Sequence, residues 1–178
     1  MRTPYLFVVL ALCLCVSLPL GAQKQQRDPL TDAQAQQIAE AGRDPDGRIG
    51  LYIKFLDDRA GDLKDLARRA PSAARTHRID DALQDFSALM DELGSNLDMY
   101  GDRKADMRTG LKTLNEAIPR WQQILHGLTS EPGFDIARED AIESSNDLAD
   151  QTKQLLVDQT EYFNLHEKEK GQERAEPQ

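Results

Sequence analysis

The chain has 178 residues and carries 22 basic against 31 acidic side chains, which gives a formal net charge of −9. An acidic chain repels phosphate backbones, so this composition argues against nucleic acid as a partner. The length predicts one domain after removal of an N-terminal targeting segment.

Residues 1–22 have the pattern of a secretory signal peptide. Arg2 supplies the positive start, residues 5–18 form an almost unbroken apolar run, and cleavage is expected after Ala22. The apolar run is short for a membrane helix, which needs about 20 residues, so we expect no integral membrane segment in the mature chain. Cys13 and Cys15 both lie inside this segment. The prediction is therefore an exported protein, periplasmic or secreted, without a thiol.

Residues 23–30 are expected to form a mobile leader, and residues 31–168 a helical bundle. Thr31 can cap the amide of Gln34, and Gln34 can reach back to Thr31, so a short helix is predicted to start here and to end at Gly42. The five residues LTDAQ at 30–34 also resemble the LTxxQ motif of a family of periplasmic stress chaperones. That resemblance implies a stress-chaperone function, although the motif occurs only once.

Residues 43–47, RDPDG, predict a turn between this helix and the next. Asp44 and Asp46 have the spacing of two ligands in an EF-hand calcium loop. Gly42 and Ile53 stand where that loop needs its first carboxylate and its bidentate glutamate. We therefore interpret the segment as a turn and not as a calcium site.

Four long amphipathic helices are predicted, over residues 48–69, 79–100, 104–128 and 136–168. The second of these could extend back to residue 73, and a reversal is expected at Gly101 and Asp102. Pro119 removes a backbone donor inside the third long helix, so a kink is expected near residues 115–118. The clearest apolar stripe recurs in steps of three and four along 79–100 and consists of Ile79, Leu83, Phe86, Leu89, Met90, Leu93, Leu97 and Tyr100. One stripe of the same kind is predicted on residues 48–69, with Tyr52, Ile53 and Leu56, and one on residues 104–128, with Trp121 as a core residue.

These elements predict an all-α fold, an antiparallel four-helix bundle with an additional short N-terminal helix. Residues 169–178 are expected to form a disordered tail. A small basic cluster at residues 68–78, which includes Arg75, is interpreted as compensation for helix ends.

Ser145, Thr152 and Gln159 interrupt the apolar side of the last helix at its own spacing. Small polar residues there allow close helix packing, since hydroxyls can bond their own helix backbone. They could instead line a polar pocket, with His126 of the preceding helix. These four residues are the candidates to face a ligand.

The mature chain lacks the patterns HExxH and GxSxG, the phosphate loop, and a glutamate three residues before any histidine. No catalytic, cofactor-binding or metal residue is assigned. We expect an exported, non-enzymatic helical bundle that acts through protein–protein contacts in the cell envelope or outside the cell, with its partner and oligomeric state left open. The alternatives are a small-ligand or metal-binding bundle and a periplasmic LTxxQ-like stress chaperone.

Overall fold

A computed structural model describes residues 28–169, and within this range the chain is helical without any strand. The all-helical class expected from the sequence is thereby confirmed. The signal segment, residues 23–27 of the leader and residues 170–178 of the tail lie outside the described residues. The elements of the described range are α1 (Asp32–Glu40), α2 (Pro45–Ala67), α3 (Ala73–Asp102), α4 (Arg108–Gly127), α5 (Asp135–Leu165) and the 3-10 turn η1 (Glu167–Glu169).

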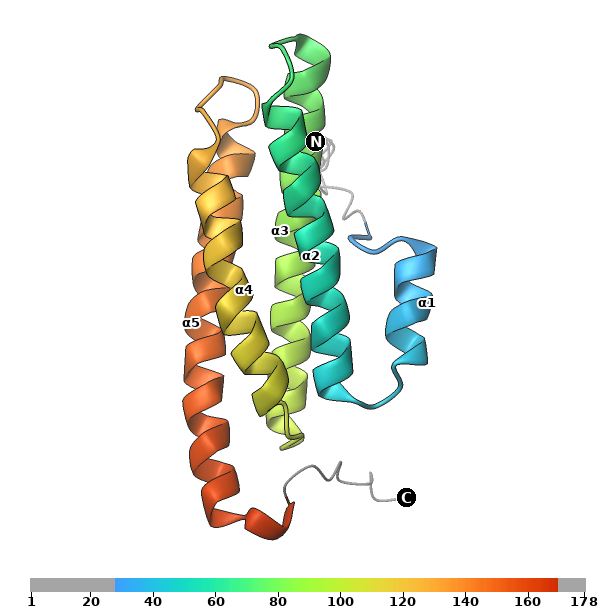
Figure 1. Cartoon of the computed structure of the whole chain (residues 1–178), viewed down its shortest axis with the longest axis vertical. Helices are drawn as coiled ribbons and strands as arrows, with labels where there is room; N and C mark the ends of the chain where they lie inside the picture. Colours follow the sequence, from blue (N-terminus) through green and yellow to red (C-terminus); the bar gives the residue numbers. More distant parts are fainter. Residues whose placement is uncertain (1–27, 170–178) are drawn as a thin grey trace, which may run out of the picture.

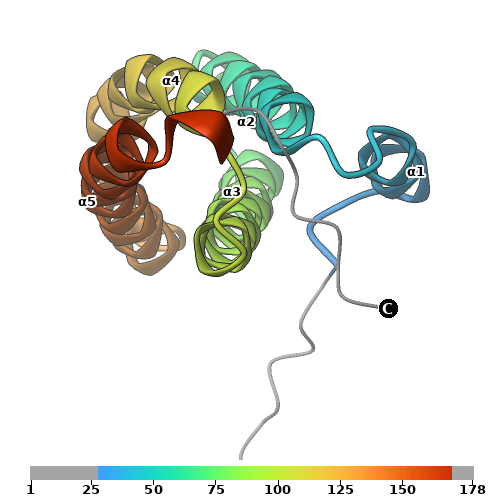
Figure 2. The ribbon, with the colours of Figure 1, turned by 90° about the horizontal axis from the view of Figure 1, so that it is seen from below.

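The helices pack as a helical bundle around one apolar core (Figure 1). Helix α2 packs against α3 and α4, and helix α5 packs against the same two helices. Seen along the bundle, α1 lies outside this group, on the α2 side (Figure 2). Between residues 28 and 169, the consecutive helices α3 and α4 are not neighbours around the bundle, although their side chains meet across the core. Their connection therefore crosses one end of the bundle diagonally.

The apolar stripes expected on residues 79–100 and 104–128 form the centre of the core. Every residue named in the first stripe is at most 1% exposed. Trp121 of α4 is 1% exposed and meets the Phe86 ring edge-on, with ring centroids 6.1 Å apart, which is a favourable aromatic geometry. Helix α4 continues through Pro119, whose side chain is exposed.

Helix α2 begins at Pro45, three residues before the predicted start, so the expected turn over residues 43–47 is wrong in its second half. Proline at the first helical position suits its fixed φ and loses no hydrogen bond, because that amide has no partner inside the helix. Asp44 caps the helix by accepting from the amide of Asp46 at 3.1 Å. The turn itself is carried by Gly42, at φ 64°.

The reversal expected at Gly101 and Asp102 is also misplaced, because both residues belong to α3. The chain turns at residues 103–107, where Lys104 has φ 56°, and α4 starts at Arg108 instead of 104. Lysine rarely adopts this left-handed conformation. Contacts with α5 hold the segment in place, so local sequence preference does not decide it.

The opposite end of the bundle is closed by Arg75, which is 9% exposed. Its guanidinium donates to the carbonyls of Leu66 at 3.1 Å and Ala67 at 3.3 Å, at the end of α2. It also forms two bonds, of 2.8 and 2.9 Å, with the carboxylate of Glu131 in the α4–α5 connection. Arg75 therefore does provide the helix-end compensation expected from the basic cluster.

Candidate interaction surface

Ser145 and Thr152, two of the residues expected to face a ligand, are buried in α5 and bonded to their own helix. The Ser145 hydroxyl donates to the Ile142 carbonyl at 2.7 Å, and the Thr152 hydroxyl donates to the Leu148 carbonyl at 2.6 Å. Both are 0% exposed. Their geometry favours close helix packing, because each hydroxyl proton is already used.

Gln159 has a different task, since it holds the α3–α4 connection. Its amide nitrogen donates to the Ala105 carbonyl at 2.9 Å, and its amide oxygen accepts from the Met107 amide at 3.2 Å. His126, in contrast, is exposed on the last turn of α4. The structure therefore places the three α5 candidates in the interior and His126 on the surface.

Two shallow grooves on the bundle surface contain none of these four residues. One lies between α4 and α5, has a volume of about 390 Å³, and passes Pro119 and Lys153. The other lies between α3 and α5, has a volume of about 290 Å³, and passes Gly94 and Gln151. Across residues 28–169, no three His, Cys, Asp or Glu side chains gather in a way that could hold a metal ion.

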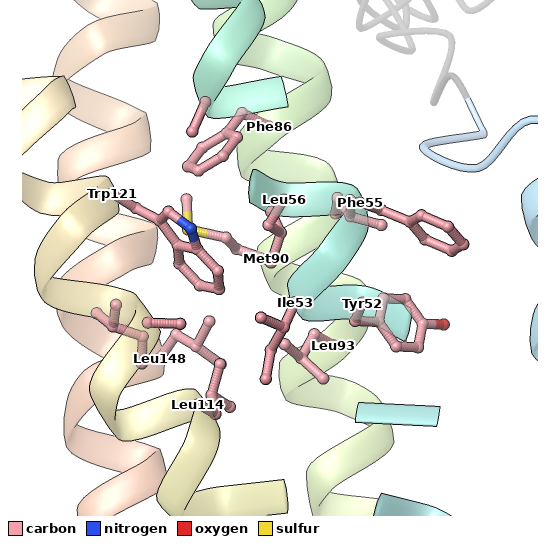
Figure 3. Packing of buried hydrophobic residues seen from close by; sticks show 14 of the residues in the cluster. Tyr52, Ile53, Phe55, Leu56, Phe86, Met90, Leu93, Leu114, Trp121 and Leu148 are labelled. Carbon is pink, nitrogen blue, oxygen red and sulfur yellow. The ribbon is translucent and has the colours of Figure 1, made fainter. Parts of the chain in front are cut away.

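A second apolar face of α2 is the feature that the bundle core does not explain. Figure 3 shows Tyr52 and Phe55 pointing away from Trp121 and towards α1, while Leu56 points into the core. Both aromatic side chains are only 1% exposed. We define the α1-facing surface as Tyr52, Phe55 and Arg59 of α2 with Glu92 and Asn96 of α3.

The α1-facing surface is covered by α1 and the residues just before it, which contribute few apolar side chains. Helix α1 buries only Ile38, which joins Tyr52 and Phe55 in the apolar cluster, and Leu30 packs against the same cluster. In the described part of the chain, α1 packs on no helix except α2. A helix of nine residues is marginal in water on its own, so α1 depends on these contacts.

Arg59 of α2 binds the start of α1 and the residues just before it. Its guanidinium donates to the Pro29 carbonyl, and it reaches the side-chain oxygen of Gln34 at 3.5 Å. Burial lowers the pKa of Arg59, while nearby carboxylates, Asp85 first among them, oppose that change. Arg59 thus binds the segment before α1 through a partly desolvated charge, which strengthens its hydrogen bonds.

The polar edge of the surface is tied to α3. The Tyr52 hydroxyl donates to the Glu92 carboxylate at 2.6 Å and accepts from the Asn96 side-chain amide at 3.2 Å. Burial raises the pKa of Tyr52 from its ordinary value, and the bond to Glu92 raises it further. The hydroxyl therefore stays protonated and fixed, and the aromatic surface is preorganised.

Sequence reasoning missed Phe55 and Arg59. Phe55 lies outside the single stripe expected for residues 48–69, which contains Tyr52, Ile53 and Leu56. The available clue was that Tyr52, Phe55 and Arg59 follow one another in steps of three and four, which places them on one second face of the helix. A helix that is apolar on two faces must be covered on both.

None of the helices between residues 28 and 169 is long and apolar enough to span a membrane. Comparisons with protein-family models, curated proteins and solved structures gave no match.

Proposed function

We propose that this is an exported, non-enzymatic protein that acts through protein–protein contacts in the cell envelope or outside the cell. Its working unit in this proposal is an antiparallel four-helix bundle with an additional short N-terminal helix. The packing of α2 and α5, each against both α3 and α4, supports that arrangement. Residues 1–22 are proposed to direct export.

The observation that carries the proposal is the α1-facing surface. It presents Phe55 and Tyr52, each 1% exposed, beneath a helix that buries only Ile38. Aromatic side chains with an adjacent arginine are the residue types that anchor protein interfaces. An amphipathic helix that displaced α1 would meet an apolar floor with a charged rim, which is the helix-in-groove mode of recognition.

The proposal that the protein has no catalytic role is supported by how its buried polar groups are used. Among residues 28–169 these are Arg75, Ser145, Thr152 and Gln159. Each is bonded to a helix backbone or to a connection between helices. Catalytic groups would instead converge on a cleft that a substrate can enter.

Site-specific photo-crosslinking in the producing cell tests the proposal. A photoreactive residue replaces Lys54, whose amine lies 5.5 Å from the Phe55 ring centroid and whose side chain is exposed. The matched control replaces Lys112, which is exposed on α4, a helix that does not pack on α1. We expect intermolecular adducts from position 54, in exported protein whose first residue is Gln23.

The same measurement with Phe55→Ala shows whether the adducts depend on the aromatic surface. Adducts that persist unchanged in this variant, equal labelling from positions 54 and 112, or no adducts at all would contradict the proposed contact surface. Full-length chain retained in the cytoplasm would contradict the export part independently.

A further inference from the structure

The connection between α1 and α2 is built like a hinge. It comprises residues 41–44, and Gly42 at φ 64° reverses the chain. Pro45, directly after it, lacks an amide proton and would clash with a preceding helical turn. Residues 28–40 therefore cannot continue α2 as one straight helix, and the direction they take from α2 is set by these four connecting residues.

The contacts of this segment do not require it to come from the same chain. Its capping box, between Thr31 and Gln34, is internal. Its remaining ties are the packing of Leu30 and Ile38 and the bonds from Arg59. Residues 28–40 of another molecule would offer the same ties, because their sequence is identical.

We propose that the partner of the α1-facing surface is a second copy of this chain, and that the two copies exchange residues 28–40. The inference rests on the proposed function of that surface in protein contacts and names the occupant. We call residues 28–40 the arm. In the exchanged dimer each chain gives its arm to the other chain and receives the other chain's arm, so the assembly is two-fold symmetric and is complete with two chains. Phe55 and Tyr52 remain covered, and the four-helix core is unchanged.

A second copy fits better than an unrelated helix because the fit is already visible within one chain. The exchange costs only the reopening of the hinge and the entropy of association, since it replaces each contact by an identical one. Opening α1 without a replacement would expose two aromatic side chains to water. The dimer therefore forms whenever the concentration of chains offsets the association cost.

Hinge variants test the exchange through the dimer Kd, measured by light scattering after gel filtration from about 10 μM to about 1 mM. Gly42→Ala penalises the left-handed turn of the closed arm in both chains, so it should tighten the dimer by about thirtyfold or more. Gly50→Ala is the matched control, because Gly50 is helical, exposed and has open space around an added Cβ. It should leave the dimer Kd unchanged.

Complementation tests whether the arm crosses between chains. Ile38→Asp removes the apolar contact that the arm makes, and Phe55→Ala removes an aromatic side chain from the α1-facing surface that receives it. Each substitution should release the arm in the closed monomer and in the dimer alike, so each variant alone should be monomeric with an undocked arm. Their mixture should form mixed dimers, since one of its two composite contacts is intact. If Phe55→Ala loses helical circular dichroism, Arg59→Ala replaces it, as Arg59 lies outside the central core.

A wild-type chain that stays monomeric through this range overturns the inference, as does a dimer that persists in Ile38→Asp alone. Crosslinks separate that failure from failure of the proposed function. Adducts from position 54 to a different protein, with a monomeric chain, would refute the second copy and retain the contact surface. Neither dimer nor adduct would refute both.

Discussion

Replacing Gln159 by leucine should destabilise the protein, because it removes the two hydrogen bonds that hold the α3–α4 connection while it keeps a similar side-chain volume. The two bonds to Ala105 and Met107 measure 2.9 and 3.2 Å. These residues are 5% and 0% exposed, so water cannot replace the lost partners. A buried backbone group left unpaired costs about 1–3 kcal/mol. We therefore expect the free energy of unfolding to fall by about 2–4 kcal/mol.

Urea denaturation followed by circular dichroism measures this loss, and hydrogen exchange locates it at the Met107 amide. Gln154→Leu is the control, because Gln154 is exposed on α5 and bonds Asp158, four residues on, at 2.9 Å. It should change the unfolding free energy by less than about 0.5 kcal/mol. A Gln159→Leu variant with wild-type stability and an equally protected Met107 amide would refute the claim that Gln159 holds the α3–α4 connection.

Three further changes test other ties by the same denaturation assay. Arg75→Met should cost about 2–4 kcal/mol, because it leaves Glu131 and the last carbonyls of α2 without their donor; stability within error of wild type would contradict this. Asp57→Ala should cost about 1–2 kcal/mol by stranding the indole N–H of Trp121, which it binds at 2.7 Å, with a matching shift in tryptophan emission. Burial raises the pKa of Asp46 from its ordinary 3.8, so the wild type loses stability as pH rises through the folded-state pKa. Asp46→Asn should therefore be the more stable protein at pH 7 and lose that advantage below the ordinary pKa, whereas a constant difference would contradict it.

Periodicity predicts the bundle core well because burial on a long helix repeats with the helix itself. Ile79, Phe86 and Leu93 fall on one side by spacing alone, and all are 0% exposed. The same spacing argument, applied to residues 104–128, places Trp121 in the core. These positions depend only on the local helical repeat, so no knowledge of the neighbouring helices is needed.

The connections and the α1-facing surface depend on contacts between distant residues, so spacing could not predict them. Lys104 adopts its left-handed conformation in a connection that Gln159 holds from α5. Phe55 is 1% exposed on the face of α2 that is turned towards α1, so its burial depends on where α1 packs (Figure 3). The side-chain amide of Gln159, which its spacing suggested as ligand-facing, binds the chain's own backbone.

Trp121 of α4 is the only tryptophan of the chain, and it is 1% exposed, bonded to Asp57 of α2 and in contact with the Phe86 ring of α3. Its fluorescence therefore reports the state of the central core. Tyr52, by contrast, lies on the face turned towards α1 (Figure 3). The molecule thus carries separate aromatic reporters for its core and for its arm. Arm release should change the environment of Tyr52 while Tyr100, 1% exposed in the core, and the indole of Trp121 keep theirs, and global melting should change all three.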